Sequence, residues 1–262
     1  MSWIFINWVI FVPYNLVKMY KDLKKIIHTL LPKKILFKIE PNLRFLWSLF
    51  YRGSKHECTV CKTNLRAWID FHKDTICPNC GSLSRDRRLW QLIEENYLKN
   101  DITVLDFSPS RSLYRKWKKQ KVTYKATDLS GDFISDNQYD ITAIPEGDNT
   151  FDLIVCYHIL EHVIDDLSAM KELHRILKST GIVLVQTPFK AGEIYEDYSI
   201  TSAEDRLKHF DQEDHVRIYS VEGLKNRLTQ SGFEVNVKEF DSEDKMHGFT
   251  KNEIVFILKK QN

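Results

Sequence analysis

The sequence predicts an α/β protein whose main domain is built on a parallel β-sheet and is preceded by a helical arm and a small cysteine module. Three observations support this prediction. A strand–helix–strand pattern covers residues 151–186, more strands and helices alternate in residues 102–142, and two Cys-x-x-Cys pairs lie within residues 58–80. Strands joined through a crossover helix lie parallel in one sheet, with the helix packed on one of its faces.

The N-terminal arm, residues 1–54, is basic. Residues 1–55 carry ten Lys/Arg and two Asp/Glu, a net charge of +8 that leaves −6 for the remainder. The apolar run at residues 3–12 is too short to cross a bilayer, which needs about 20 residues, and residues 14–31 then show an amphipathic helical pattern. Residues 1–31 therefore either contact a membrane surface or pack as helices on the protein or on a partner.

The cysteine module, residues 55–82, holds two Cys-x-x-Cys pairs separated by fifteen residues. Each pair can form a knuckle that points two thiolates at one ion, and two knuckles fill a tetrahedral Zn²⁺ shell without an open position. We expect a structural zinc held by Cys58, Cys61, Cys77 and Cys80. The alternatives are a metal-free remnant or a dithiol redox pair. Cysteines in metal-type spacing indicate a reducing compartment, so we expect a cytoplasmic location, with or without membrane association.

The main domain, residues 83–262, begins with a helix that carries three arginines. Arg85, Arg87 and Arg88 either bind an anionic ligand or pair with acidic groups of this larger domain, and the second interpretation is favoured. Near the end of the domain we expect a helix that Ser220 caps. Two strands follow that helix at 233–240 and 253–259, and their short connection predicts antiparallel pairing.

The first strands of the main domain end in acidic residues. The first strand ends at Asp106, and Ser110 then caps a helix. The second strand ends at Asp128, twenty-two residues after Asp106. An acidic residue about 20 residues beyond the first βα turn is where mononucleotide folds grip the ribose hydroxyls. A third short strand is expected to end at residues 140–142.

The strand–helix–strand pattern that follows is the most informative stretch of the chain. Residues 153–157 are apolar and come after turn-forming residues, which predicts a buried strand. A helix is expected from Asp165, because apolar residues recur at helical spacing after it. Gly181 occupies the position of a left-handed C-terminal cap, and residues 182–185 predict the next strand.

Polar residues come directly after the first of these strands, at the sheet edge where open parallel sheets bind ligands. His158 and His162 are candidate general bases, because an unperturbed imidazole titrates near about 6.5, and Glu161 is the carboxylate expected to orient them. His215 lies on a long polar segment, residues 190–215, and is expected to complete the site when that segment closes. The alternative for these histidines is packing or cofactor contact without proton transfer. The match of this stretch to H-x-x-E-H is interpreted as chance, because the helix begins too late to hold both histidines.

The order of the elements resembles that of the class I S-adenosylmethionine-dependent methyltransferases, as a methyltransferase type 11-like domain, over roughly residues 100–262. The most specific motifs of this resemblance are residues 151–154, 158–162 and 173–178 with Gly181. The resemblance implies a Rossmann-like, seven-stranded sheet with an antiparallel last strand. The cysteine pairs in front of it are similar to the zinc-ribbon-like module of a bacterial subgroup of such methyltransferases.

The resemblance also implies S-adenosyl-L-methionine as the cofactor and a set of residues that bind it. These residues are Asp106, Phe107, Ser108, Pro109, Asp128, Leu129, Asp140, Ile141, Tyr157 and His158. One departure concerns the first βα turn, which the family fills with glycine because glycine takes positive φ freely. Here the turn, residues 106–110, has no glycine, so we expect the cofactor to bind in an adjusted pose or weakly.

Three functions stay open at this point. The leading one is methyl transfer from S-adenosylmethionine to a small-molecule or glycan acceptor. The second is RNA methylation with the zinc module as the recognition element, although a net charge of +2 does not favour nucleic acid. The third is a non-catalytic binding protein whose cofactor site has decayed.

Overall fold

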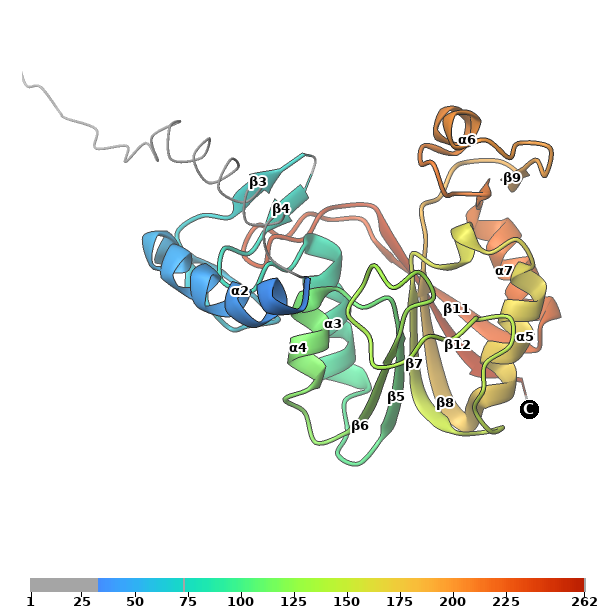
Figure 1. The fold of residues 1–262 in the computed structure, drawn as a ribbon, viewed down its shortest axis with the longest axis horizontal. Coiled ribbons are helices and arrows are strands. Elements are labelled where there is room, and N and C mark those ends of the chain that lie inside the picture. The colour runs from blue at the N-terminus through green and yellow to red at the C-terminus, as the bar shows by residue number, and fades with distance from the viewer. Residues whose placement is uncertain (1–32, 73, 262) are drawn as a thin grey trace, which may run out of the picture.

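The computed structural model describes residues 33–72 and 74–261. The amphipathic pattern predicted for residues 14–31, and with it the expected membrane or partner contact of residues 1–31, lies outside the described residues. The last part of the arm forms helix α2 (Lys33–Ser48), which crosses the outside of the molecule in Figure 1. It is held to the main domain by Arg115, which donates to the Phe37 carbonyl at 2.7 Å and to Glu40 at 2.9 Å. Among the described residues, no helix is long and apolar enough to cross a membrane.

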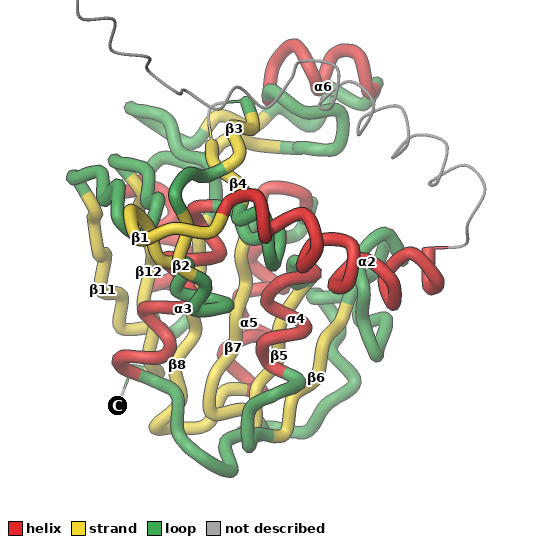
Figure 2. The backbone as a smooth tube through the Cα atoms, turned by 90° about the vertical axis from the view of Figure 1, so that its left-hand side faces the viewer, coloured by secondary structure: helices red, strands yellow, loops and turns green. Residues whose placement is uncertain are grey.

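The main domain is built on one six-stranded sheet, whose strands stand side by side in Figure 2 in the order β11-β12-β8-β7-β5-β6. Strands β6, β5, β7 and β8 are parallel to one another, and β12 is antiparallel to both β8 and β11. The predicted α/β fold with an antiparallel last strand is therefore confirmed. The strands are β5 (Thr103–Phe107), β6 (Thr123–Thr127), β7 (Phe151–Tyr157), β8 (Leu177–Gln186), β11 (Phe233–Phe240) and β12 (Glu253–Lys260).

The sheet has six strands and not the seven that were predicted, because residues 140–142 form a turn. The Asp140 carboxylate accepts hydrogen bonds from both the backbone N–H (2.8 Å) and the hydroxyl (2.7 Å) of Thr142, which bends the chain locally. A single isolated bridge, between Thr127 and Asn137, joins the segment before this turn to β6. A short side-chain turn has replaced the third strand at the edge of the sheet.

The predicted cap at Gly181 is also wrong. Helix α5 (Asp166–Ile176) begins where expected, with Asp165 as its N-cap, but it ends at Ile176 and passes directly into β8. Gly181 lies inside β8, next to a register shift between β7 and β8. A Cβ atom on Gly181 would lie 2.7 Å from Leu177 Cδ1 and 3.0 Å from the Phe151 carbonyl oxygen, so close packing and not a left-handed turn requires glycine here.

Helices cover both faces of the sheet and create two cores (Figure 1). Helices α5 and α7 (Val221–Gln230) cover one face, while α3 (Ser84–Asn96) and α4 (Arg111–Trp117) cover the other. Successive strand residues point to opposite faces, so Leu105 joins the first core and Val104 the second. The second core includes Trp90 and Trp117, whose rings meet edge to face at 5.0 Å.

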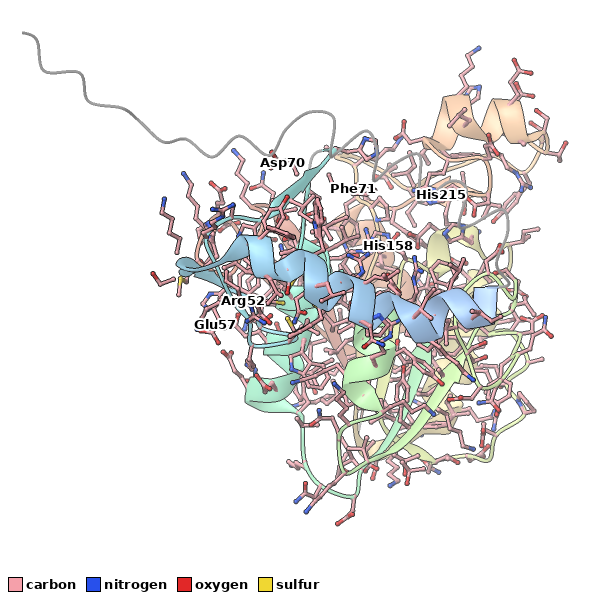
Figure 3. The ribbon with its side chains drawn as sticks, turned by 60° about the vertical axis from the view of Figure 1, so that its left-hand side comes forward. Arg52, Glu57, Asp70, Phe71, His158 and His215 are labelled. Atoms are coloured by element: carbon pink, nitrogen blue, oxygen red, sulfur yellow. The ribbon has the colours of Figure 1, made fainter. Side chains whose placement is uncertain are left out.

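The cysteine module consists of two small hairpins packed on the second core. Strands β1 (Arg52–Glu57) and β2 (Asn64–Leu65) form one hairpin, and β3 (Ile69–Phe71) and β4 (Asp74–Ile76) form the other. Figure 3 labels the ends of β1 and the last two residues of β3. Because Cys58, Leu65 and Cys77 share one core with Trp90, the module packs as an extension of the main domain.

The segment of residues 190–215 was expected to be a long loop with little regular structure, and this expectation is wrong in part. It contains helix α6 (Ala203–Phe210) and strand β9 (Tyr195–Glu196), which pairs with β10 (Arg217–Ile218) just beyond the segment. Ser202 caps α6 by accepting from the Asp205 N–H at 3.1 Å. In Figure 1 this segment stands above α5 and α7, at the carboxyl end of the sheet.

Candidate functional site

A pocket of about 870 Å³ opens at the carboxyl ends of β5, β6 and β7. This volume lies within the usual range for small-molecule and cofactor sites, roughly 300–1,000 Å³. Its walls come from the turn after β5, the loop after β6, residues 139–142, the segment after β7 and residues 212–215. The pocket therefore lies where parallel sheets bind ligands.

The turn after β5 adopts a backbone conformation that glycine favours, although the turn contains no glycine. Ser108 has a φ of +46°, which is in the left-handed region. Its N–H donates to the Thr127 carbonyl at 2.7 Å, and its hydroxyl donates to Asp128 Oδ1 at 2.7 Å. These two bonds hold the unfavourable backbone conformation in place and join the turn to the end of β6.

Asp128 is an ionised carboxylate at the wall of the pocket. Burial would raise its pKa, but hydrogen bonds outweigh that effect and the pKa is lowered. Besides Ser108, the donors are the Ser130 hydroxyl at 2.9 Å and the Phe133 N–H at 3.2 Å. The two serine hydroxyls rotate freely, so they can yield to ligand hydroxyl groups that seek the same oxygens.

The pKa of Asp106, at the end of β5, is shifted in the opposite direction. Burial raises the pKa of its carboxyl to about 8, and repulsion from the nearby Asp86 adds to this effect. The Tyr124 hydroxyl donates to Asp106 Oδ2 at 3.1 Å, which opposes the shift without cancelling it. Asp106 is therefore protonated at neutral pH and can donate a hydrogen bond into the pocket.

His158 stands at the end of β7 beside a buried carboxylate. Its φ is +55°, and its Nδ1 lies 3.2 Å from Glu161 Oε1. Burial alone would raise the pKa of Glu161, which is 1% exposed, but the contact with His158 lowers it. The pair therefore consists of a carboxylate that orients an imidazole, which is the arrangement of an assisted general base.

His162 and His215 meet beside this pair, with ring centroids 4.7 Å apart and the rings edge to face. His215 arrives from the segment beyond α6, and the Val216 N–H donates to the Glu161 carbonyl at 2.9 Å. Burial lowers the pKa of His215, and the neighbouring His162 lowers it further. Figure 3 labels His158 and His215, which come from the two segments that form this end of the pocket.

The strand order, the pocket position and this cluster of side chains are those of a nucleotide-type cofactor domain. A family model described as a methyltransferase domain matches residues 83–238. The chain belongs to this methyltransferase family. Together with the strand order, the match confirms the predicted class I S-adenosylmethionine-dependent methyltransferase and shows the protein to be an enzyme.

Individual relatives of this methyltransferase are distant. An uncharacterised protein of Methanocaldococcus jannaschii is 37% identical over 84 residues, which cover 30% of this chain and only 37% of that protein. The solved structure of the YcgJ protein from Bacillus subtilis is 12% identical, with a TM-score of 0.48, over 68% of this chain and 100% of that chain. A SAM-dependent methyltransferase from Archaeoglobus fulgidus is 16% identical, with a TM-score of 0.48, over 66% of this chain and 91% of that chain.

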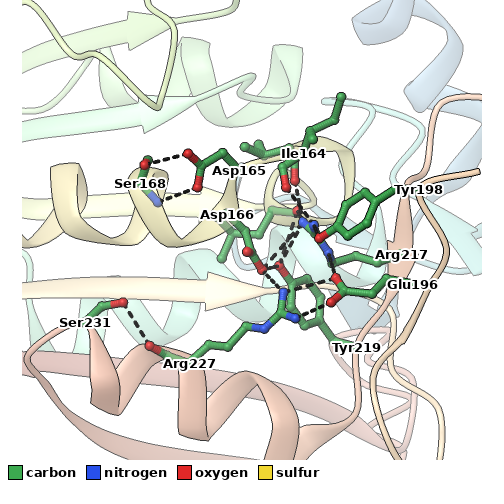
Figure 4. Close-up of polar contacts among 12 residues, drawn as sticks. Ile164, Asp165, Asp166, Ser168, Glu196, Tyr198, Arg217, Tyr219, Arg227 and Ser231 are labelled. Atoms are coloured by element: carbon green, nitrogen blue, oxygen red, sulfur yellow. Dashed lines mark hydrogen bonds and ion pairs between the residues drawn. The ribbon is translucent and has the colours of Figure 1, made fainter.

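An arginine network fixes the segment that carries His215 of the methyltransferase (Figure 4). Arg217 is fully buried and donates to Glu196 at 2.9 Å and to the Ile164 carbonyl at 2.8 Å. Its guanidinium also donates to the carbonyls of Leu160 and Val163. Further ion pairs join Arg227 to Glu196 and Asp166. The network ties β9 and β10 to the loop after β7, so the segment is closed over the site in this structure.

The four cysteines of the module fit a tetrahedral metal site. Their sulfur atoms all lie within 4.8 Å of one another, with Cys58 and Cys80 at 3.6 Å and Cys61 and Cys77 at 3.7 Å. A Zn–S bond of about 2.3 Å in a tetrahedron places sulfur atoms about 3.8 Å apart. Each pair forms the same knuckle, because the N–H groups of Lys62 and Gly81 donate to the carbonyls of Cys58 and Cys77.

The structure brings together every site residue that the sequence predicted for the main domain. All of the predicted cofactor and catalytic residues line the pocket, although their roles remain predictions. These residues are Asp106, Phe107, Ser108, Pro109, Asp128, Leu129, Asp140, Ile141, Tyr157, His158, His162 and His215.

The arginines after the module divide into two groups. Arg88 pairs with Glu253 at 2.8 Å, as the favoured interpretation held. Arg87 is also structural, but it donates to the carbonyls of Ser82 and Gly248 and not to an acidic group. Arg85 instead lines the pocket. Sequence reasoning missed Asp86, Phe133, Tyr139 and Asp214 as lining residues. For Asp214, its position next to His215 is the one signal that points to it.

Proposed function

We propose that this methyltransferase transfers a methyl group to a hydroxyl group of a small-molecule or glycan acceptor. The observation that carries the proposal is the His158–Glu161 pair at the wall of the pocket, 3.2 Å apart. A hydroxyl acceptor must lose its proton during the transfer, and an imidazole oriented by a carboxylate is suited to receive it.

Different residues of the pocket would bind the cofactor and remove the proton of the acceptor. S-adenosylmethionine supplies a methyl group on a sulfonium sulfur, which keeps the electron pair of the broken C–S bond while the C–O bond forms. Asp128 would accept hydrogen bonds from the ribose hydroxyls, in exchange for those of Ser108 and Ser130. His158 would take the proton of the acceptor, and Glu161 would stabilise the resulting imidazolium.

Binding of the cofactor tests the first part of this proposal. Calorimetry of the folded protein with S-adenosylmethionine should show binding, and Asp128→Asn should weaken it about tenfold or more, because hydrogen bonds to a charged group contribute about 1.5–3 kcal/mol. Asp101→Asn is the matched control. Asp101 is an exposed residue in the left-handed region, which asparagine tolerates, and it lies at the opposite end of β5. Folded wild-type protein that binds no S-adenosylmethionine would refute the proposal.

Transfer to an acceptor tests the second part. With labelled S-adenosylmethionine and panels of small hydroxyl compounds, glycans and RNA, we expect label in the first two panels. His158→Gln should slow turnover by about 10²-fold or more, the usual contribution of a general base. Label transferred to RNA alone would overturn the proposed acceptor class.

We also propose a structural zinc ion at the four cysteines. The closed shell of sulfur atoms and their spacing support this assignment. Metal analysis of the purified protein should give one zinc ion per chain. Protein that folds and melts normally without any bound metal would contradict it.

A further inference from the structure

A second group of side chains that could hold a metal ion lies beside the pocket, and it contains no cysteine. Glu161, His162 and His215 each place one ligand atom within 4.8 Å of the others. Two imidazoles and one carboxylate on one side of a shared space are a donor set that holds divalent transition metals with open positions left over. His162 and His215 also line the pocket, so open positions would face a bound acceptor.

Two of the three ligand atoms are buried and lack a hydrogen-bond partner among the described residues. Glu161 is 1% exposed and His215 is 3% exposed. Within residues 33–72 and 74–261, neither Glu161 Oε2 nor His215 Nε2 has a hydrogen-bond partner, although both atoms are out of contact with solvent. A buried polar atom without a partner costs about 1–3 kcal/mol, so native proteins rarely leave two of them together unless a ligand satisfies both.

The other nitrogen of each histidine is already oriented. His215 Nδ1 lies 3.1 Å from the Phe210 carbonyl oxygen, which only accepts, so Nδ1 is the donor and Nε2 carries the lone pair. His162 Nδ1 lies 3.2 Å from Asp214 Oδ2, which fixes this ring in the same sense. Metal-binding histidines almost always use one nitrogen for the ion and donate the other N–H to a carbonyl or carboxylate.

We propose that Glu161, His162 and His215 bind a divalent first-row transition metal ion at the acceptor end of the pocket. Glu161 serves two partners, since Oε1 contacts His158 and Oε2 is left for the ion. A bound ion would supply Lewis-acid chemistry that lowers the pKa of an acceptor hydroxyl, and His158 would then receive the proton more readily. This role rests on the proposed function, whereas the binding of the ion does not.

Manganese is the probe that distinguishes this site from the cysteines. Thiolates select zinc, while carboxylate and imidazole ligands accept Mn²⁺. Protein that holds one equivalent of zinc, which the thiolates take up, is titrated with Mn²⁺, and loss of the free-ion electron paramagnetic resonance signal counts the bound ions. We expect one Mn²⁺ per wild-type chain and at least about tenfold weaker binding in Glu161→Gln, His162→Gln and His215→Gln, since removing even an outer partner of a ligand costs about 10–100-fold.

His209→Gln is the matched control, because His209 is an exposed histidine on α6, near His215 in sequence, and its ring contacts Tyr195 and Phe210. His162 is 30% exposed on its side chain, so His162→Gln is the variant least prone to unfold. Wild-type protein that binds no Mn²⁺, or folded variants that bind it as well as wild type, would overturn the site. Calorimetry with S-adenosylmethionine on the same samples separates the outcomes. Cofactor binding without Mn²⁺ binding refutes only the metal site, and the reverse refutes only the proposed function.

Discussion

The glycine-free turn after β5 allows a direct test of the backbone at Ser108. Ser108→Ala and Ser108→Gly both remove the hydroxyl that donates to Asp128, so the difference between the two variants reports the backbone alone. Alanine keeps the penalty of a φ of +46°, and glycine does not. A left-handed alanine costs about 1 kcal/mol more than a glycine, even after the larger unfolded-state entropy of glycine is included.

The expected order of stability follows from the contacts of Asp128. A hydrogen bond to a carboxylate contributes about 1.5–3 kcal/mol, and Asp128 keeps Ser130 and Phe133 as donors, so the low end applies. Ser108→Ala should lower the free energy of unfolding by about 1.5 kcal/mol, and Ser108→Gly by only about 0.5 kcal/mol. Urea unfolding of zinc-loaded protein measures both. An alanine variant as stable as the glycine variant, or more stable, would show that Ser108 is not held in the left-handed region.

Three further predictions concern the cysteines, Asp106 and Arg217. Cys77→Ser should abolish zinc binding and lower the melting temperature by roughly 5–10 °C, because the module shares the second core and each kcal/mol shifts melting by about 2–4 °C; wild-type zinc content in this variant would contradict the site. Asp106, with its pKa raised to about 8, keeps a proton that the unfolded chain releases near about 3.9. The free energy of unfolding of the wild type should therefore fall, relative to Asp106→Asn, as the pH rises from about 4 to about 8. The loss is up to about 5 kcal/mol, at about 1.36 kcal/mol per pKa unit, and parallel pH profiles of unfolding for the two proteins would exclude the shift. Arg217→Met should lower the free energy of unfolding by about 3–5 kcal/mol, because it removes a fully buried cation and leaves carbonyls without donors. Arg206→Met, at a more exposed position of the same segment, should lower it by less than about 1 kcal/mol in the same melting assay.

The parts of the fold that the sequence predicts correctly depend on local signals. Residues 153–157 are apolar without interruption because β7 is buried on both faces. Ser110, Asp165 and Ser220 each accept a hydrogen bond from the N–H three residues later, as their capping positions predict. The cysteine spacing and the two strand-end aspartates are also local signals, because the residue type and its interval along the chain are sufficient for the prediction.

The parts that the sequence does not predict depend on contacts between distant segments. Nothing near Gly181 in the sequence indicates that Leu177 and the Phe151 carbonyl would crowd it. Similarly, the sequence places His215 on a loop, but its contact with His162 depends on Arg217, which lies 54 residues from the Val163 carbonyl that it binds. The grouping of Glu161, His162 and His215 is therefore a tertiary feature, which local patterns cannot show.

The connection between β11 and β12 links the module to a late part of the chain. Its backbone accepts from Arg87 at His247 and Gly248, and the Glu57 N–H donates to Met246. These partners lie about 160 residues beyond Arg87. At a synthesis rate of about 5–20 residues per second, the early module waits roughly 10–30 s on the ribosome for the backbone that closes it. We expect the proposed zinc ion to hold the two hairpins together during that interval, so that zinc supply at the time of synthesis would affect the yield of native protein.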